Sequence, residues 1–421
     1  MLARAVAPLH GVGGLERHVL DLVRHLTRRG VLVSLVTKPP RRDAAVSLDS
    51  GLGTPHFVPY LTFPFAGRRG TTVLDRSSAY PLFGWRAGRV AARMVRSGGV
   101  HIVHGLGASA WGYAEARRRD WLGTVPFVFN PQGLEEFGAT DPGRATLKRL
   151  GYRPLQAVVR RTAQSADRVI ATDMALVPTV LRHLDVQPSR VRVVPNAIDL
   201  EEMDRLTDLA RAHDLRHRLG LGANEVILVS VGRLEESKGF HHLIAALAKL
   251  KAGDPTGHGP LGERWRAVLI GDGPYRPRLE RDAAAAGLAT HVLFPGRLSD
   301  AELHAWYEAA TLFVHPTLYE GSSLVTLEAM AHRRAVVGTL AGGLPDKIRP
   351  GQNGWLVEPG DPAALGRALS EALGARHRLD AMGAEGRAIV TKEFAWPAVA
   401  DRLVALYDEV LSGRQAAPSV Q

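Results

Sequence analysis

The chain of 421 residues contains no cysteine. This absence excludes disulfide bonds, thiolate metal sites and catalysis by a thiol nucleophile. The sequence also has no apolar run of membrane-spanning length, which requires about 20 residues. The apolar stretch near the N-terminus, residues 2–9, is short and interrupted by Arg4, so it does not predict a secretory signal. We therefore expect a cytoplasmic protein.

Three cofactor-binding patterns are absent as well. Gly11 and Gly13 are followed at the required third glycine position by Glu16, so the dinucleotide-binding pattern G-x-G-x-x-G is incomplete. No Asp-x-Asp pair occurs, and the 17 histidines form no His-Glu-x-x-His arrangement. These absences argue against a nicotinamide enzyme and against a bound catalytic metal.

The charge is distributed unevenly along a chain that is long enough for two domains. Residues 1–195 hold 28 Lys and Arg against 13 Asp and Glu, whereas residues 196–421 hold 25 against 29. The net charge of +11 therefore comes entirely from the first half. A solvated, arginine-rich surface would explain any single basic run. The asymmetry itself indicates an anionic partner of the first half: a membrane surface, a lipid phosphate or a nucleic acid.

Strand and helix patterns alternate along most of the chain, which is typical of an α/β fold with doubly wound parallel sheets. The first series of expected strands covers residues 31–36, 100–104, 126–130, 168–172 and 191–195, with a short strand near residues 2–6. The second covers residues 226–231, 267–271, 291–295, 312–315 and 335–338.

Two segments of the first half fit this alternation less well. Residues 37–84 are rich in glycine, proline and aromatic residues, and they read equally as an irregular connection with one short strand or as mobile loops that reach a substrate. A helix opened by Pro154 carries arginines on its outer face, and we expect it to pack on the sheet rather than to lie in a membrane.

The stretch from Val314 to Ala331 carries the strongest chemical signal. A buried strand breaks at Pro316, and a polar loop then enters a helix that Ser322 or Ser323 caps. Backbone N–H groups at such a helix start favour anions. Glu320 and Glu328 flank this position, and carboxylates accept hydrogen bonds from hydroxyl groups. A phosphate joined to hydroxyl-rich groups, as in a nucleotide sugar, fits both features.

Two more turns between a strand and a helix carry candidate binding residues. Arg233 and Lys238 lie in the turn after the strand at 226–231, at the sheet edge where ligands of α/β proteins bind. Gly13 and Gly14 precede a helix that begins near Leu15, and glycines there allow a ligand close to the backbone.

These motifs resemble those of family 4 glycosyltransferases with the GT-B fold. The resemblance rests mainly on GRLEESKGF at 232–240, EGSSLVTLEAMA at 320–331 and AGGLPD at 341–346. It implies two Rossmann-like domains facing across a cleft, at residues 1–195 and 196–395. It also implies a helix at about 396–411 that returns to the first domain, and we expect a disordered tail at 412–421.

The resemblance also implies roles for individual residues. Arg233 and Lys238 would bind the donor diphosphate, Glu328 would accept the ribose hydroxyls, and Glu320 would contact the transferred sugar. The remaining donor-binding candidates are Gly13, Gly14, Gly321, Ser322, Ser323, Leu324 and, for the base, Arg297. The acceptor side departs from the family pattern, because Leu106 stands where a second histidine is common after His104, and Gln132 and Ala197 also differ. His104 is therefore the weakest catalytic candidate, and a satisfied histidine at a strand end is the alternative.

Together these features predict a retaining, metal-independent glycosyltransferase that moves a sugar from a nucleoside-diphosphate-sugar to a hydroxyl. No other cofactor is expected. The expected acceptor is a hydroxyl of a glycan, a glycolipid or a small molecule, and a lipid-linked or polysaccharide precursor at the cytoplasmic face of a membrane is the leading candidate. The basic first half of the chain would bind that membrane surface peripherally. A sugar-nucleotide-binding protein without activity is the alternative. A nucleic-acid-binding protein would leave the second half unexplained.

Overall fold

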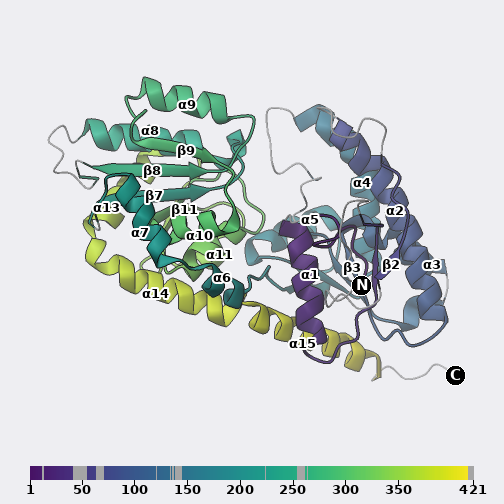
Figure 1. Cartoon of the computed structure of the whole chain (residues 1–421). Helices are drawn as coiled ribbons and strands as arrows, with labels where there is room; N and C mark the ends of the chain where they lie inside the picture. The colour runs from purple at the N-terminus through teal and green to yellow at the C-terminus, as the bar shows by residue number, and fades with distance from the viewer. Residues whose placement is uncertain are drawn as a thin grey trace. The chain divides into compact units, whose positions relative to one another are not determined.

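The computed structural model describes residues 1–11, 14–40, 55–62, 71–119, 121–132, 134, 137, 145–222, 224–253, 261–262 and 264–415. The chain divides into two compact units. Unit 1 comprises residues 1–196 and 396–421, and unit 2 comprises residues 197–395. Each unit is an α/β structure built on parallel strands (Figure 1). Within the described ranges, no helix is both long and apolar enough to cross a membrane.

Unit 2 contains a six-stranded parallel sheet in the order β12-β11-β10-β7-β8-β9. The order reverses between β10 and β7, and in open α/β sheets this reversal opens a crevice at the carboxyl ends of the two strands. The five strands expected from the sequence are confirmed to within two residues, while β12 was not expected. The strands are β7 (Val226–Val231), β8 (Trp265–Ile270), β9 (Val292–Gly296), β10 (Leu312–His315), β11 (Val336–Thr339) and β12 (Gly354–Val357).

Helices cover both faces of this sheet, and for that reason its strands are apolar on both sides. Along β7, Val226 and Leu228 belong to one buried cluster, whereas Ile227 and Val229 belong to another. Ser299 and Glu302 form the expected capping box at the start of α10. The helices are α6 (Leu200–Leu206), α7 (Leu209–Arg218), α8 (Phe240–Ala252), α9 (Arg276–Ala285), α10 (Asp300–Ala309), α11 (Leu324–Ala331), α12 (Leu344–Lys347), α13 (Pro362–Gly374) and α14 (Leu379–Ile389).

Unit 1 has a parallel sheet of short strands. The expected strand at the N-terminus is reduced to Leu2, which bridges Val36 on one side and Gly105 on the other. Leu2 thereby joins the pair β1-β2 to the order β3-β4-β5-β6. The strand expected at 31–36 begins only at residue 35. The strands are β1 (Leu35–Thr37), β2 (Pro55–Phe57), β3 (Val103–Leu106), β4 (Phe127–Asn130), β5 (Arg168–Ala171) and β6 (Val191–Val193).

Helix α2 (Thr71–Arg96) corrects the expectation of an irregular segment up to residue 84. The sequence conceals it because Pro81, Gly84 and Gly88 disfavour a helix locally. Both glycines serve packing instead. A Cβ on Gly84 would lie 1.8 Å from the Ala108 oxygen, and one on Gly88 would lie 2.0 Å from the Tyr113 nitrogen. The close approach of neighbouring backbone therefore overrides the local preference.

The other helices of unit 1 include a second correction. The helix expected to open at Pro154 begins nine residues earlier, at Ala145, with Pro154 in its interior. A proline inside a helix removes one backbone hydrogen bond but does not end the helix when packing supports both flanks. These helices are α1 (Gly14–Thr27), α3 (Trp111–Arg119), α4 (Ala145–Ser165) and α5 (Val177–Leu184).

Helix α15 (Trp396–Gln415) is the final element and belongs to unit 1 (Figure 1). It continues through Gln415, so residues 412–415 are helical where a disordered tail was expected, and residues 416–421 lie outside the described ranges. Trp396 is buried and stacks on His25 of α1, with ring centroids 5.4 Å apart. Farther along, Glu409 accepts hydrogen bonds from Arg168 and Arg192. The last twenty described residues thus complete the first unit.

Candidate functional site

The loops after β7 and β10 meet at the reversal point of the unit 2 sheet. The Ser237 carbonyl accepts hydrogen bonds from the Leu318 N–H at 2.8 Å and from the Thr317 hydroxyl at 3.2 Å. Gly239 has φ +66°, and a Cβ there would lie 1.9 Å from the Pro316 oxygen. A glycine is therefore required for the two loops to approach this closely.

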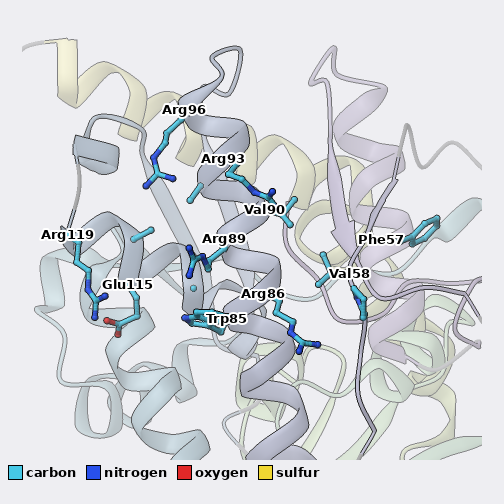
Figure 2. Close-up of a pocket in the computed structure, with 14 residues that line it drawn as sticks. Phe57, Val58, Trp85, Arg86, Arg89, Val90, Arg93, Arg96, Glu115 and Arg119 are labelled. Carbon is cyan, nitrogen blue, oxygen red and sulfur yellow. The ribbon is translucent and has the colours of Figure 1, made fainter.

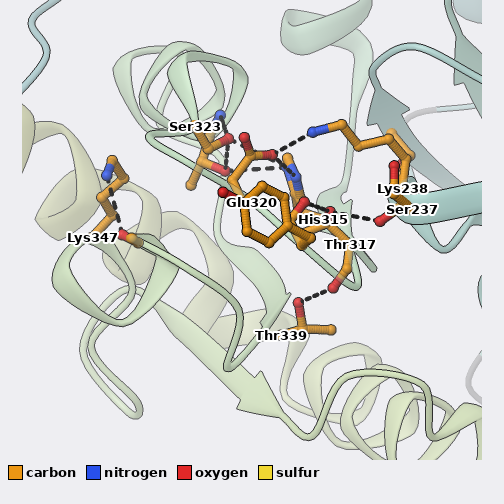
Figure 3. A network of polar contacts seen from close by, with 12 residues as sticks. Ser237, Lys238, His315, Thr317, Glu320, Ser323, Thr339 and Lys347 are labelled. Carbon is orange, nitrogen blue, oxygen red and sulfur yellow. Dashed lines mark hydrogen bonds and ion pairs between the residues drawn. The ribbon is translucent and has the colours of Figure 1, made fainter. Parts of the chain in front are cut away.

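The loop after β11 packs against the same region (Figure 3). The Thr339 hydroxyl donates to the Thr317 carbonyl at 2.6 Å, and the Gly343 N–H donates to the Gly321 carbonyl at 3.1 Å. Gly342 has φ +52°, and a Cβ there would lie 1.7 Å from the backbone carbonyl oxygen of Glu320. The three loops consequently hold one another through contacts to the backbone, and these contacts fix the position of Glu320.

The Glu320 carboxylate lies between a lysine and a histidine (Figure 3). Lys238 Nζ donates to Glu320 Oε2 at 2.8 Å, and His315 Nε2 lies 3.0 Å from the same oxygen. The side chains are largely shielded from solvent, since their exposed fractions are 24% for Lys238, 13% for Glu320 and 5% for His315. The sequence predicted Lys238 and Glu320 as site residues, and the structure brings them into contact.

The charge of Glu320 is set by these two neighbours. Burial alone would raise its pKa, but the hydrogen bond and charge of His315, together with Lys238, outweigh burial and lower the pKa to about 2. An ionised carboxylate can only accept, so His315 Nε2 must carry the proton in this contact. Its Nδ1 lies 3.3 Å from the Thr326 hydroxyl. His315 thus links the start of α11 to Glu320.

Helix α11 begins above β10 with a capped first turn. Ser323 is the N-cap, because its hydroxyl accepts from the Thr326 N–H at 3.3 Å. Of the two serines expected as caps, Ser323 therefore takes this role. The Ser322 hydroxyl is buried without a hydrogen-bond partner, and unsatisfied buried polar groups are uncommon. The Ser322 hydroxyl and the backbone N–H groups from Gly321 to Leu324 together form a position rich in hydrogen-bond donors. Such a position suits an anion.

Glu328 lies on the second turn of α11 and has a fixed partner. The Tyr307 hydroxyl of α10 donates to Glu328 Oε2 at 2.8 Å. Burial, reinforced by the Glu328 charge and this hydrogen bond, raises the pKa of Tyr307 well above its usual value, so the phenol stays protonated. The contact therefore holds one carboxylate oxygen and restricts the orientation of the group.

The two predicted arginines do not join this network. Arg233 follows β7, but its side chain is 65% exposed and pairs with Glu235 at 3.0 Å. Arg297 is exposed and follows β9, the edge strand farthest from β10 in the order β10-β7-β8-β9. If Arg233 is to bind a diphosphate that Lys238 also binds, its side chain must first leave Glu235.

The predicted residues of unit 1 are placed differently. Gly14 is the first residue of α1, whereas Gly13 lies outside the described residues. His104 is 4% exposed and lies within β3, two residues before its end. Its Nδ1 lies 2.6 Å from the Tyr407 hydroxyl of α15. His104 is thus packed beneath the returning helix, while its Nε2 is buried without a hydrogen-bond partner among the described residues, and a catalytic role for it stays a prediction.

Lowering the pH below 6.5 should destabilise unit 1 through His104. Burial, followed by the charges of the N-terminal amine and His18, lowers the His104 pKa from 6.5 to about 3. The unfolded chain binds a proton at higher pH than the folded chain, so stability falls as the pH falls from 6.5 towards 3. The loss for this one group should reach about 2 kcal/mol near pH 5. Thermal unfolding of His104→Gln should therefore depend less steeply on pH than that of the wild type.

The exposed His101 provides the control. His101→Gln should keep the wild-type pH dependence, because the His101 side chain is already exposed to solvent in the folded chain. An identical pH dependence of thermal unfolding in the wild type and His104→Gln would contradict the attribution of this destabilisation to His104.

Sequence reasoning missed two members of the site. His315 ends β10 and was read only as part of a buried strand, although a histidine five residues before Glu320 was a detectable signal. Tyr307 could not have been found, since it lies on α10, 21 residues before Glu328 in the chain. In the described part of the chain no group of three or more His, Asp or Glu side chains is arranged to hold a metal ion.

Comparisons with known proteins agree with this architecture. Residues 12–202 match the family model described as Glycosyltransferase Family 4, and residues 212–389 match the one described as Glycosyl transferases group 1. The chain is 29% identical to D-inositol 3-phosphate glycosyltransferase 1 of Catenulispora acidiphila, over 96% of this chain and 93% of that protein. It is 28% identical to D-inositol 3-phosphate glycosyltransferase of Salinispora tropica, over 96% and 84%.

Solved structures share the fold at low sequence identity. Sucrose-phosphate synthase from Thermosynechococcus elongatus superimposes with a TM-score of 0.73 at 23% identity, covering 98% of this chain and 96% of that one. Anabaena HepE in complex with UDP gives 0.69 at 18% identity, with coverage of 97% and 100%. The two matching family models account for both halves of the sequence. The chain therefore belongs to the family 4 glycosyltransferases of the GT-B fold and is a retaining, nucleotide-sugar-dependent enzyme of that family.

Proposed function

We propose that the site in unit 2 binds a UDP-sugar, and that the enzyme transfers this sugar to a hydroxyl of an anionic acceptor. The observation that carries the proposal is the contact of Lys238 and His315 with Glu320 at the sheet reversal point. A cation and a carboxylate stand side by side there, at the start of a helix. This combination suits a diphosphate that is joined to a sugar.

Each residue has a part in the proposed reaction. Lys238, together with Arg233 after it leaves Glu235, neutralises the charge that develops as the nucleoside diphosphate departs. The Ser322 hydroxyl, which is buried without a partner, and the first turn of α11 donate to the phosphate oxygens. Glu328, oriented by Tyr307, accepts from the ribose hydroxyls.

The bond changes follow from retention. The bond between the anomeric carbon and the phosphate oxygen breaks, and a bond to the acceptor oxygen forms on the same face of the sugar. The acceptor proton passes to the departing phosphate, so no protein base is required. Glu320, kept ionised by its neighbours, stabilises the positive charge that the sugar gains.

The acceptor is inferred from charge and from the relatives. Residues 1–195 carry an excess of 15 positive charges, which favours an acceptor bearing phosphate or carboxylate. A lipid-linked or polysaccharide precursor meets this condition. D-inositol 3-phosphate, named for the relatives, is a second candidate because it is a phosphorylated polyol.

A panel of nucleotides and acceptors tests the proposal. In a thermal-shift experiment UDP and UDP-sugars should raise Tm more than GDP or ADP, since a ligand at a hundred times its Kd stabilises by about 2.7 kcal/mol. The best donor should then be hydrolysed slowly by the enzyme alone, and its sugar should be transferred to D-inositol 3-phosphate or to a lipid-linked precursor. Absence of both stabilisation and hydrolysis with every nucleotide sugar would overturn the proposal.

A further inference from the structure

Unit 1 has a pocket of about 810 Å³ on its outer surface (Figure 2). Helix α2 forms its floor, with residues 57–59 at the carboxyl end of β2 on one side and α3 on the other. The other lining residues belong to α2 and α3, and none comes from the segments that follow β4, β5 and β6.

The outward face of α2 is basic over its second half. Arg86, Arg89, Arg93 and Arg96 follow one another at intervals of three or four residues and all line the pocket. At 3.6 residues per turn these intervals place them within about 80° of one another on the helix. Arg119 of α3 adds a fifth guanidinium.

These charges are poorly balanced by neighbouring acids. Glu115 is the one acid among the lining residues, and it already pairs with Arg118 at 3.8 Å and accepts from the Trp111 indole. Among the described residues, Arg86 and Arg93 form no ion pair. The pocket therefore presents a net positive surface to an anionic partner.

Apolar side chains lie on the same face of the helix. Leu74, Leu82 and Trp85 are exposed to 48%, 38% and 38%. At 3.6 residues per turn Leu82 falls within the sector of the arginines, and Trp85 and Leu74 lie about 20° and 40° beyond its edge. Phe57, the last residue of β2, and Leu61, in the segment that follows, are exposed to 43% and 56%. In the described part of the chain, five of the large exposed apolar side chains thus come from residues 57–85.

We infer that this face of α2 binds the surface of an anionic membrane. Arginines attract acidic lipid headgroups, while leucine and aromatic side chains enter the boundary between headgroups and acyl chains. Trp85 combines both properties, because its ring lies 4.9 Å from the Arg89 guanidinium and its edge remains exposed. A nucleic acid or a small phosphorylated ligand would use the arginines but would leave the leucines without a role.

The inference extends the proposed function, since it supplies a surface that brings the enzyme to a lipid-borne acceptor. It also explains why the positive excess lies in the first half of the chain. The binding is peripheral, with the apolar side of α2 still packed on α3 and α4 of the same unit.

Vesicle sedimentation with the full chain tests the inference. The wild type should sediment with vesicles of phosphatidylcholine mixed with phosphatidylglycerol, and not with phosphatidylcholine alone. Binding should weaken from low salt to physiological salt, at which charges are screened beyond about 8 Å. The double variant R89S/R93S should lower the partition constant about 30-fold, which corresponds to about 1 kcal/mol per arginine. L82S/W85S should lower it while leaving its salt dependence intact.

A matched variant controls for net charge. R24S/R28S removes two exposed arginines at α1, which lies on the other side of the unit 1 sheet from α2 (Figure 1), and it should bind vesicles like the wild type. Equal sedimentation of R89S/R93S and the wild type would overturn the inference. So would retention of an oligonucleotide without vesicle binding, or equal binding to neutral and anionic vesicles at low salt.

Donor hydrolysis separates this inference from the proposed function. R89S/R93S should hydrolyse the donor at the wild-type rate in the absence of vesicles, because neither arginine belongs to the donor site. Vesicle binding without any donor hydrolysis would leave the membrane surface standing and reject the proposed reaction. Hydrolysis without vesicle binding would do the reverse.

Discussion

Replacing Lys238 with methionine should lower kcat/KM for sugar transfer about 100- to 1,000-fold, the usual effect of removing one preorganised group that stabilises transition-state charge. Methionine keeps the length of the side chain and removes the cation. The loss should appear mainly in kcat, because the diphosphate becomes fully charged only as its bond to the sugar breaks. Steady-state kinetics with the best donor measure both parameters.

A second effect of this change should be structural. Glu320 would keep its contact with His315 but lose the Lys238 cation. A buried carboxylate that loses a counter-charge destabilises the folded chain. Circular dichroism should therefore confirm that Lys238→Met is folded at the assay temperature. Lys251→Met, at the far end of α8, removes a lysine whose amine reaches only a backbone carbonyl, and it should retain wild-type kinetics. A rise in donor KM with unchanged kcat would show that Lys238 contributes ground-state binding instead.

Changing Glu320 to glutamine should lower kcat about 10- to 100-fold, from the loss of one charge-assisted contact of roughly 1.5–3 kcal/mol. Glutamine keeps the size of the side chain and can still accept from Lys238. Affinity for UDP should not weaken, because UDP lacks the transferred sugar that Glu320 would contact, and Lys238 is then held by a neutral amide rather than by a carboxylate.

Glu328 provides the contrast within the same motif. Glu328→Ala should raise the donor KM and largely keep kcat, since a ribose contact is present in both ground and transition states. Tyr307→Phe removes only the hydroxyl that donates to Glu328 and should shift the same parameter by a smaller factor. Normal turnover of Glu320→Gln, combined with loss of turnover in Glu328→Ala at unchanged UDP affinity, would reverse the assigned roles.

The donor side was predictable from the sequence because its signals are local. Lys238 and Glu320 each follow a strongly apolar strand, and a strand-to-helix turn in a parallel sheet has a known position at the ligand-binding edge. Ser323 and the cap of α11 could be read from neighbouring residues for the same reason. The sequence could not show that Arg233 turns towards Glu235, because a long side chain in an exposed loop has many orientations.

The first unit was less predictable because its structure depends on contacts distant in sequence. Helix α2 forms although proline and glycine disfavour it, since Gly84 and Gly88 permit close approach of backbone more than twenty residues away. The strand at Leu2 exists only as a bridge between two segments. The contact of His104 with Tyr407, more than three hundred residues later, could not be foreseen from the sequence.

The return of α15 to the first unit determines the order in which the molecule can be completed during synthesis. Trp396 on His25 and Glu409 on Arg168 join residues of the first half of the chain to residues that are among the last to leave the ribosome. Unit 2 is continuous in the chain and can fold as it emerges, whereas unit 1 must wait for the C-terminus with part of its core uncovered. Premature termination near residue 395 would therefore damage the N-terminal unit and leave the whole sequence of unit 2 in the shortened product.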